Sequence, residues 1–219
     1  MAVHTEPVER RLVSEAVFDA LLSDVLAGRL APGDALPSER ALSDGFAVNR
    51  HAVREAIKRL QQACLVQVAQ GGATRVCDWR RTAGLDLLTS LAGAARGAER
   101  TALLVDIAQM RATVGADVAR LCAERAPAAA RITPAVTVEG YVAFWEAITD
   151  GADNLAYRLA LNTLVAAQRH GAIDPRIYAA EIADAGAQRA LADAIAAGDA
   201  AGAERLAKQL LSRTVQGLR

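Results

Sequence analysis

The chain has 219 residues, enough for one large domain or two modest ones, and its 53% hydrophobic and 23% charged residues exclude a disordered chain. Lys and Arg number 25, as do Asp and Glu, so the formal net charge is zero, which excludes a polybasic tail but permits a local basic face. Aromatic residues make up only 4%, and the frequent use of alanine favours helices over a β-sandwich.

The cysteines Cys64, Cys77 and Cys122 are few, far apart and without CxxC spacing. This pattern is typical of free or buried thiols in a reducing compartment. The acidic N-terminal stretch does not resemble a signal peptide, and no uncharged apolar run is long enough to cross a bilayer. We therefore expect a cytoplasmic protein without membrane contacts.

The first third of the chain has helical periodicity interrupted by turns. Apolar residues recur at helical spacing over 8–28, and Pro32 followed by Gly33 predicts a turn. Ser38 and Asn49 are capping residues, so each should begin a further helix. Three short helices are therefore expected before residue 65.

The periodicity then changes to that of a β-hairpin. Residues 65–69 and 74–77 form two short apolar runs separated by a turn that contains glycine. Three helices followed by a hairpin outline a winged helix-turn-helix, and no strand pattern follows Trp79. The sequence predicts a mainly α fold, with a winged helix-turn-helix domain over 1–78 and an all-helical bundle over 79–219. The helical segments of the bundle are expected at roughly 80–95, 99–125, 134–150, 153–170, 174–197 and 199–216.

The helix expected after Asn49 has a cationic face. On a helical projection of 50–61, Arg50 lies at the flank of the face opposite the apolar residues. The residues on that opposite face are His51, Arg54, Glu55 and Lys58. Such a face suits the major groove, because arginine forms paired hydrogen bonds with guanine and helix N-terminal N–H groups favour phosphate. By itself the helix could also be an ordinary solvated surface, and the neighbouring turn, helix and hairpin favour nucleic-acid binding.

Stretches 28–43 and 48–57, together with the hairpin glycine Gly71, resemble the DNA-binding domain of GntR-family transcription regulators. The helical remainder resembles the effector domain of the FadR subfamily, through 84–88 and 153–157. This resemblance implies a homodimer that binds a palindromic operator in double-stranded DNA and responds to a small-molecule effector.

The resemblance also implies which residues contact DNA. Asn49 could instead act only as a helix cap, and Gly71 only as a turn residue. We expect Glu55 to order the arginines or the helix rather than to touch DNA, because phosphates repel a carboxylate. The residues carried over as DNA-binding are Arg40, Asn49, Arg50, His51, Arg54, Gln70 and Gly71.

Many FadR-type effector domains hold a divalent metal ion through one Asp and three His side chains. This chain has three histidines in all, and His170 falls near the end of an expected helix, where it would cap or face solvent. None of the residues at the corresponding positions is a convincing ligand, so we expect no metal and no other cofactor. These positions correspond approximately to Tyr141, Trp145, Gln188 and Leu210.

Without a metal, an effector pocket should be aromatic and apolar, with a few polar anchors. The resemblance suggests an acyl-CoA or another carboxylate metabolite as the effector. Each candidate could equally be an ordinary core residue. The candidate lining residues are Arg111, Tyr141, Trp145, Asn154, Tyr157, Arg158 and Tyr178.

The sequence bears on three classes of function: an enzyme, a transcription regulator and a helical scaffold protein. An enzyme is not supported, because the sequence shows no Ser–His–Asp or Cys–His pairing, no P-loop and no GxGxxG before a helix. The favoured hypothesis is a ligand-responsive transcription regulator. The alternative is a helical interaction or scaffold protein whose winged-helix domain does not read DNA.

Overall fold

The computed structural model describes residues 13–69, 72–125 and 132–219, and the chain divides into two compact units at Leu87 and Leu88. We expected the boundary after residue 78. The short helix α4 (Trp79–Thr82) instead belongs to the first unit, where the Thr82 hydroxyl donates a hydrogen bond of 2.8 Å to the Cys64 carbonyl oxygen.

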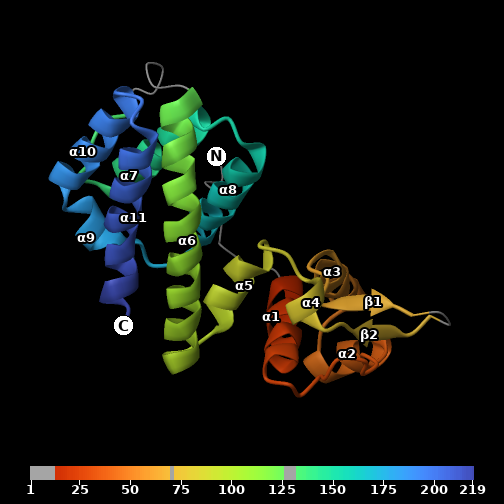
Figure 1. Cartoon of the computed structure of the whole chain (residues 1–219). Coiled ribbons are helices and arrows are strands. Elements are labelled where there is room, and N and C mark those ends of the chain that lie inside the picture. The colour runs from red at the N-terminus through yellow and green to blue at the C-terminus, as the bar shows by residue number, and fades with distance from the viewer. Residues whose placement is uncertain (1–12, 70–71, 126–131) are drawn as a thin grey trace, which may run out of the picture. The chain divides into compact units, whose positions relative to one another are not determined.

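The first unit is the expected winged helix-turn-helix (Figure 1). Its three helices bury one apolar face each, and the hairpin follows the third helix directly. The elements are α1 (Val13–Leu26), α2 (Glu39–Phe46), α3 (Arg50–Gln62), β1 (Val66–Val68) and β2 (Thr74–Val76).

Both predicted helix starts are confirmed. The Ser38 hydroxyl accepts a hydrogen bond of 3.2 Å from the Ala41 N–H, which caps α2. The Asn49 side-chain oxygen accepts one of 2.8 Å from the Ala52 N–H, which caps α3. Between them, Ala47 takes a left-handed conformation (φ 54°) and turns the chain from one helix to the next.

Backbone hydrogen bonds join the turn before α2 to the hairpin. Strands β1 and β2 are antiparallel, and Ala35 forms an isolated bridge with Arg75 of β2. Gly33 has a φ of +91°, as the predicted turn requires, and its N–H donates a hydrogen bond of 2.8 Å to the Val76 carbonyl oxygen. The wing and the helix-turn-helix therefore form one small structural body.

The second unit, residues 88–219, is an all-helical bundle around α6 (Gly97–Arg125), a helix of 29 residues that packs along α11 (Ala200–Gly217) (Figure 1). A Cβ atom on Gly115 would collide with Leu211, so this glycine lets the two helices approach closely. No helix in the described part of the chain is long and apolar enough to span a bilayer. The other elements are α5 (Leu87–Ala94), α7 (Val138–Gly151), α8 (Leu155–Arg169), η1 (Pro175–Tyr178), α9 (Ala179–Ile182) and α10 (Ala185–Ala196).

Two of the expected helical segments are broken. Segment 80–95 is interrupted between α4 and α5, where Ala83 has an extended conformation. Segment 174–197 divides into η1, α9 and α10, because Pro175 begins a 3-10 turn and the Asp184 carboxylate caps α10 through the Ala187 N–H at 2.8 Å. Helical periodicity alone did not reveal these local caps.

Candidate functional site

One face of the winged helix-turn-helix is exposed and cationic. We call the exposed side chains of Arg40, Arg50, His51, Arg54 and Lys58 the basic face. The opposite side of α3 is buried in the core of the first unit, as the helical projection predicted. The core therefore fixes the rotation of α3 and directs these cationic groups towards solvent.

Arg54 is oriented by a carboxylate from the neighbouring helix. Its Nε donates hydrogen bonds of 3.1 and 3.0 Å to the two oxygens of Glu39, and its Nη2 lies 2.9 Å from one of them. Hydrogen bonding within this pair lowers the pKa of Glu39 and raises the pKa of Arg54. We expected Glu55 to order the arginines, but for Arg54 it is Glu39, fifteen residues earlier, that does so.

The other residues predicted to contact DNA differ in their surroundings. Asn49 is exposed and uses its side-chain oxygen to cap α3. Gln70 and Gly71 lie outside the described residues. The next residue, Gly72, has a φ of +87°, which glycine adopts without strain at the tip of a hairpin.

A buried polar cluster lies in the interior of the helical unit. The guanidinium of Arg111 on α6 forms a forked pair with the Glu181 carboxylate on α9, at 3.0 and 2.8 Å. The Tyr141 hydroxyl donates to Glu181 at 2.5 Å, and the Thr214 hydroxyl of α11 also donates to this carboxylate. The Tyr178 ring lies 4.4 Å from the guanidinium carbon. Five elements thus converge on one charge-neutral ion pair.

The charges of this cluster follow from its contacts. Burial disfavours the charged form of Arg111, but Glu181 and Tyr141 outweigh that effect and raise the pKa of Arg111 above its usual value. Burial raises the pKa of the Tyr141 hydroxyl, so this group keeps its proton and donates a hydrogen bond to the carboxylate. Glu181 is completely buried and has its hydrogen-bond partners within the bundle.

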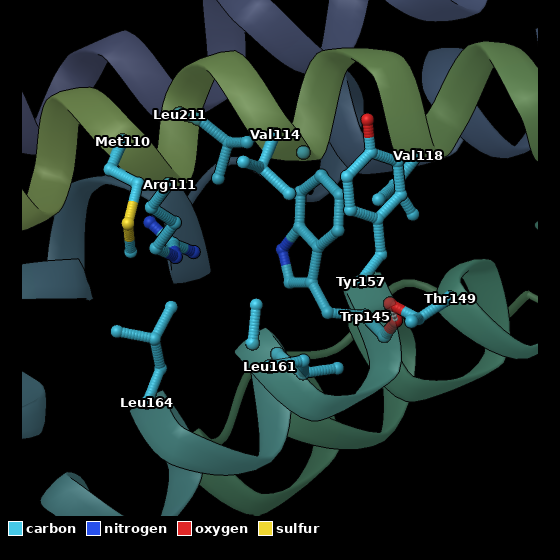
Figure 2. Close-up of a pocket in the computed structure, with 12 residues that line it drawn as sticks. Met110, Arg111, Val114, Val118, Trp145, Thr149, Tyr157, Leu161, Leu164 and Leu211 are labelled. Carbon is cyan, nitrogen blue, oxygen red and sulfur yellow. Dashed lines mark hydrogen bonds between the residues drawn. The ribbon is translucent and has the colours of Figure 1, made fainter. Parts of the chain in front are cut away.

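Two small cavities border the cluster. The first, about 50 Å³, lies among α6, α7, α8 and α11, and the second, about 40 Å³, lies on the side of Tyr141 and Tyr178. Arg111 and Trp145 line both cavities, and Tyr157 lines the first (Figure 2). The structure therefore brings five of the seven candidate pocket residues together.

The remaining two candidates support α8. The Asn154 side chain caps this helix by accepting hydrogen bonds from the N–H groups of Ala156 and Tyr157 at 3.1 and 3.3 Å. Arg158 donates to the Glu146 carbonyl oxygen at 2.8 Å and pairs with Asp150. The contacts of Arg158 join the start of α8 to α7. Neither Asn154 nor Arg158 lines the two cavities.

Glu181 and Thr214 are functional candidates that the sequence patterns did not reveal. Glu181 lies on a four-residue helix, and its partner Arg111 is 70 residues earlier in the chain. A buried glutamate in this position has no periodic pattern that distinguishes it from a surface glutamate. Only an expectation that Arg111 needs a buried counter-ion could have directed attention to it.

The residues at the metal positions of FadR-type domains do not fit a metal ion. The Gln188 amide accepts from the Ala135 N–H at 2.8 Å and donates to main-chain carbonyls, and the Tyr141 hydroxyl is bound to Glu181. Trp145 and Leu210 offer no metal-binding atom. Within the described ranges, no group of three or more His, Cys, Asp and Glu side chains could hold a metal ion. His170, exposed, is the C-cap of α8.

Comparison with known proteins identifies the family. The profile of the bacterial regulatory proteins of the gntR family matches residues 13–76, which include the basic face. The HTH-type transcriptional regulator Mce2R of Mycobacterium tuberculosis is 39% identical over 225 aligned residues, covering 94% of this chain and 91% of that protein. The fatty acid metabolism regulator protein of an Enterobacter species is 35% identical over 72 residues, covering 33% of this chain and 30% of that protein.

Among solved structures, the chain aligns with GntR of Streptococcus agalactiae at 19% identity and a TM-score of 0.48. The alignment covers 93% of this chain and 99% of that one. The sequence relatives are transcriptional regulators and not enzymes, which favours the regulator hypothesis over the helical scaffold. The chain belongs to the GntR family of DNA-binding transcriptional regulators.

Proposed function

We propose that this regulator acts as a homodimer that binds a palindromic operator and changes its DNA affinity when a small molecule occupies the helical unit. The observation that carries the DNA-binding part is the exposed basic face, in which Glu39 holds Arg54 in a fixed orientation. Two copies of α3 would enter the major groove at successive half-sites of the operator.

Within the basic face, the roles differ by position. Arg50 and Arg54 lie one turn apart on α3, so they would contact neighbouring bases or phosphates along the groove. Arg40 on α2 and His51 on α3 would contact the flanking phosphate backbone of the DNA, while the Asn49 side chain caps the N-terminus of α3. Gln70 and Gly71, which the family resemblance assigns to the wing, would approach the minor groove.

The effector would occupy the cavities beside Arg111 and Trp145, since these are concave and mainly apolar. An acyl-CoA or another carboxylate metabolite is the class that the family resemblance suggests. Such a molecule changes operator affinity only by as much as it prefers one conformation of the regulator to another. The free thiols Cys64, Cys77 and Cys122 are consistent with action in the reducing cytoplasm.

Substitution of Arg50 or Arg54 tests the DNA contacts. The operator would be selected from random duplexes with the wild-type chain, and its affinity then measured by fluorescence anisotropy. We expect Arg50→Ala and Arg54→Ala each to lose about 1–3 kcal/mol of operator affinity. Arg205→Ala, an exposed position on α11, is the matched control and should bind as the wild type does. Unchanged affinity of both α3 variants would refute this arrangement.

A further inference from the structure

The indole of Trp145 has an unsatisfied polar atom. The side chain is 6% exposed, and its Nε1 forms no hydrogen bond of normal geometry with the residues that the structure describes, although its interaction with the Tyr141 hydroxyl acts to lower the pKa of that group. Buried N–H groups are nearly always paired in folded proteins, because leaving one unpaired costs free energy. In Figure 2 this nitrogen faces the space between Arg111 and Leu164, so the unpaired donor is directed into the first cavity.

The charge beside the cavity is already balanced. The guanidinium of Arg111 donates to Glu181 and Tyr141, and the pair carries no net charge. A carboxylate entering the cavity would add an unbalanced negative charge to a partly open but mainly apolar site, which is unfavourable. A neutral acceptor would satisfy Trp145 without that penalty.

The remaining walls are hydrocarbon. Leu161 and Leu164 of α8 lie across the first cavity from Met110 and Arg111 of α6, and the same two leucines line the second cavity (Figure 2). The two cavities therefore share one wall. Helix α8 buries only Val165 and Ala167 of its 15 residues, so it can move outward at lower cost than the helices of the core. Each cavity holds a few heavy atoms as it stands, and displacement of α8 would join them.

We propose that the helical unit binds a neutral, mainly apolar molecule through one carbonyl oxygen, as in an ester, thioester or ketone, which accepts a hydrogen bond from Trp145 Nε1. The site thereby rejects free carboxylates. This inference rests on the proposed function and narrows it: the cavity would take the neutral acyl part of an effector such as an acyl thioester, and it would exclude a metabolite that brings a free carboxylate into the cavity.

A matched pair of probes tests the inference on the full chain. Trp79→Phe leaves Trp145 as the sole tryptophan, whose fluorescence would be titrated with methyl hexanoate and with hexanoate at neutral pH. We expect the ester to bind at least tenfold more tightly than the acid, because only the acid brings a charge into the cavity. Calorimetry on the wild-type chain compares the same two molecules without relying on tryptophan fluorescence.

Two variants locate the binding. Trp145→Phe keeps an aromatic ring but removes the donor, and it should weaken ester binding about three- to tenfold. Ala160→Leu, on the α8 side of the first cavity, fills the space and should abolish ester binding. Circular dichroism would show that both variants remain folded.

The inference would be overturned by equal affinity for the ester and the acid, by no ester binding, or by unchanged ester affinity in Trp145→Phe. Ester binding that leaves operator affinity unchanged would support the inference and contradict the ligand response proposed above. The DNA-contact test with Arg50→Ala is independent of either result.

Discussion

At the scale of single residues, the pair between Arg111 and Glu181 determines the character of the bundle interior. A buried ion pair adds little to stability compared with apolar residues of similar size, because both charges lose their hydration. Removal of one partner is different, since it leaves the other charge buried and uncompensated. The forked geometry and the donors Tyr141 and Thr214 satisfy the carboxylate that would otherwise be costly to bury.

Glu181→Gln should therefore destabilise the helical unit by about 3–5 kcal/mol, because Arg111 stays charged without a counter-ion. Urea unfolding followed by circular dichroism measures the change. The double variant Arg111→Met with Glu181→Gln removes both charges and should recover most of the loss. A loss below about 1 kcal/mol in the single variant would show that solvent reaches the pair.

At the scale of elements, the N-terminus of α3 depends on one side chain. Asn49 satisfies the Ala52 N–H, one of the donors that lack a partner in the first turn of a helix. The cap also places Arg50 at the first position of α3, where the helix dipole and free N–H groups favour phosphate. Loss of the cap would fray the turn that carries two residues of the basic face.

Asn49→Ala should lower the stability of the first unit by about 1 kcal/mol, whereas Asn49→Ser should retain most of it, because serine caps nearly as well as asparagine. Chemical denaturation of the three proteins gives the comparison. Asn162→Ala, an exposed mid-helix position on α8, is the control and should be neutral. Equal stability of the Asn49→Ala variant and wild type would contradict the capping role.

At the scale of the whole molecule, the proposed function requires two copies on one operator. A single winged helix-turn-helix contacts one half-site, and a dimer gains specificity by contacting two on the same face of the duplex. The zero net charge of the chain means that non-specific attraction to DNA comes from the basic face and not from the molecule as a whole.

Sedimentation should therefore find two chains per operator. Insertion of about 5 base pairs between the half-sites, roughly half a turn of the duplex, should sharply reduce affinity because the half-sites then lie on opposite faces. Insertion of about 10 base pairs, roughly one full turn, returns the two half-sites to the same face of the duplex and serves as the control. One chain per operator, or indifference to the insertion of about 5 base pairs, would refute the dimeric arrangement.

A feature of the fold could be predicted from the sequence when the residues that interact to form it lie close together in the chain. The caps at Ser38 and Asn49, the turn at Gly33, the hairpin and the basic face all depend on residues close together in the chain, so their patterns are visible in the sequence. The breaks within 80–95 and 174–197 were missed because alanine-rich helices look alike on either side of a short cap.

Local patterns along the chain were enough to predict the winged helix-turn-helix, the helical bundle and the face that α3 presents, because helical periodicity and capping involve neighbouring residues. Three features became visible only once the helices were packed: Glu39 orients Arg54, Glu181 neutralises Arg111, and the Trp145 N–H faces a cavity without a hydrogen bond of normal geometry among the described residues. Fifteen residues separate the first pair and 70 the second. Over such separations a linear pattern carries no information about which side chains meet, since packing of the helices makes that choice.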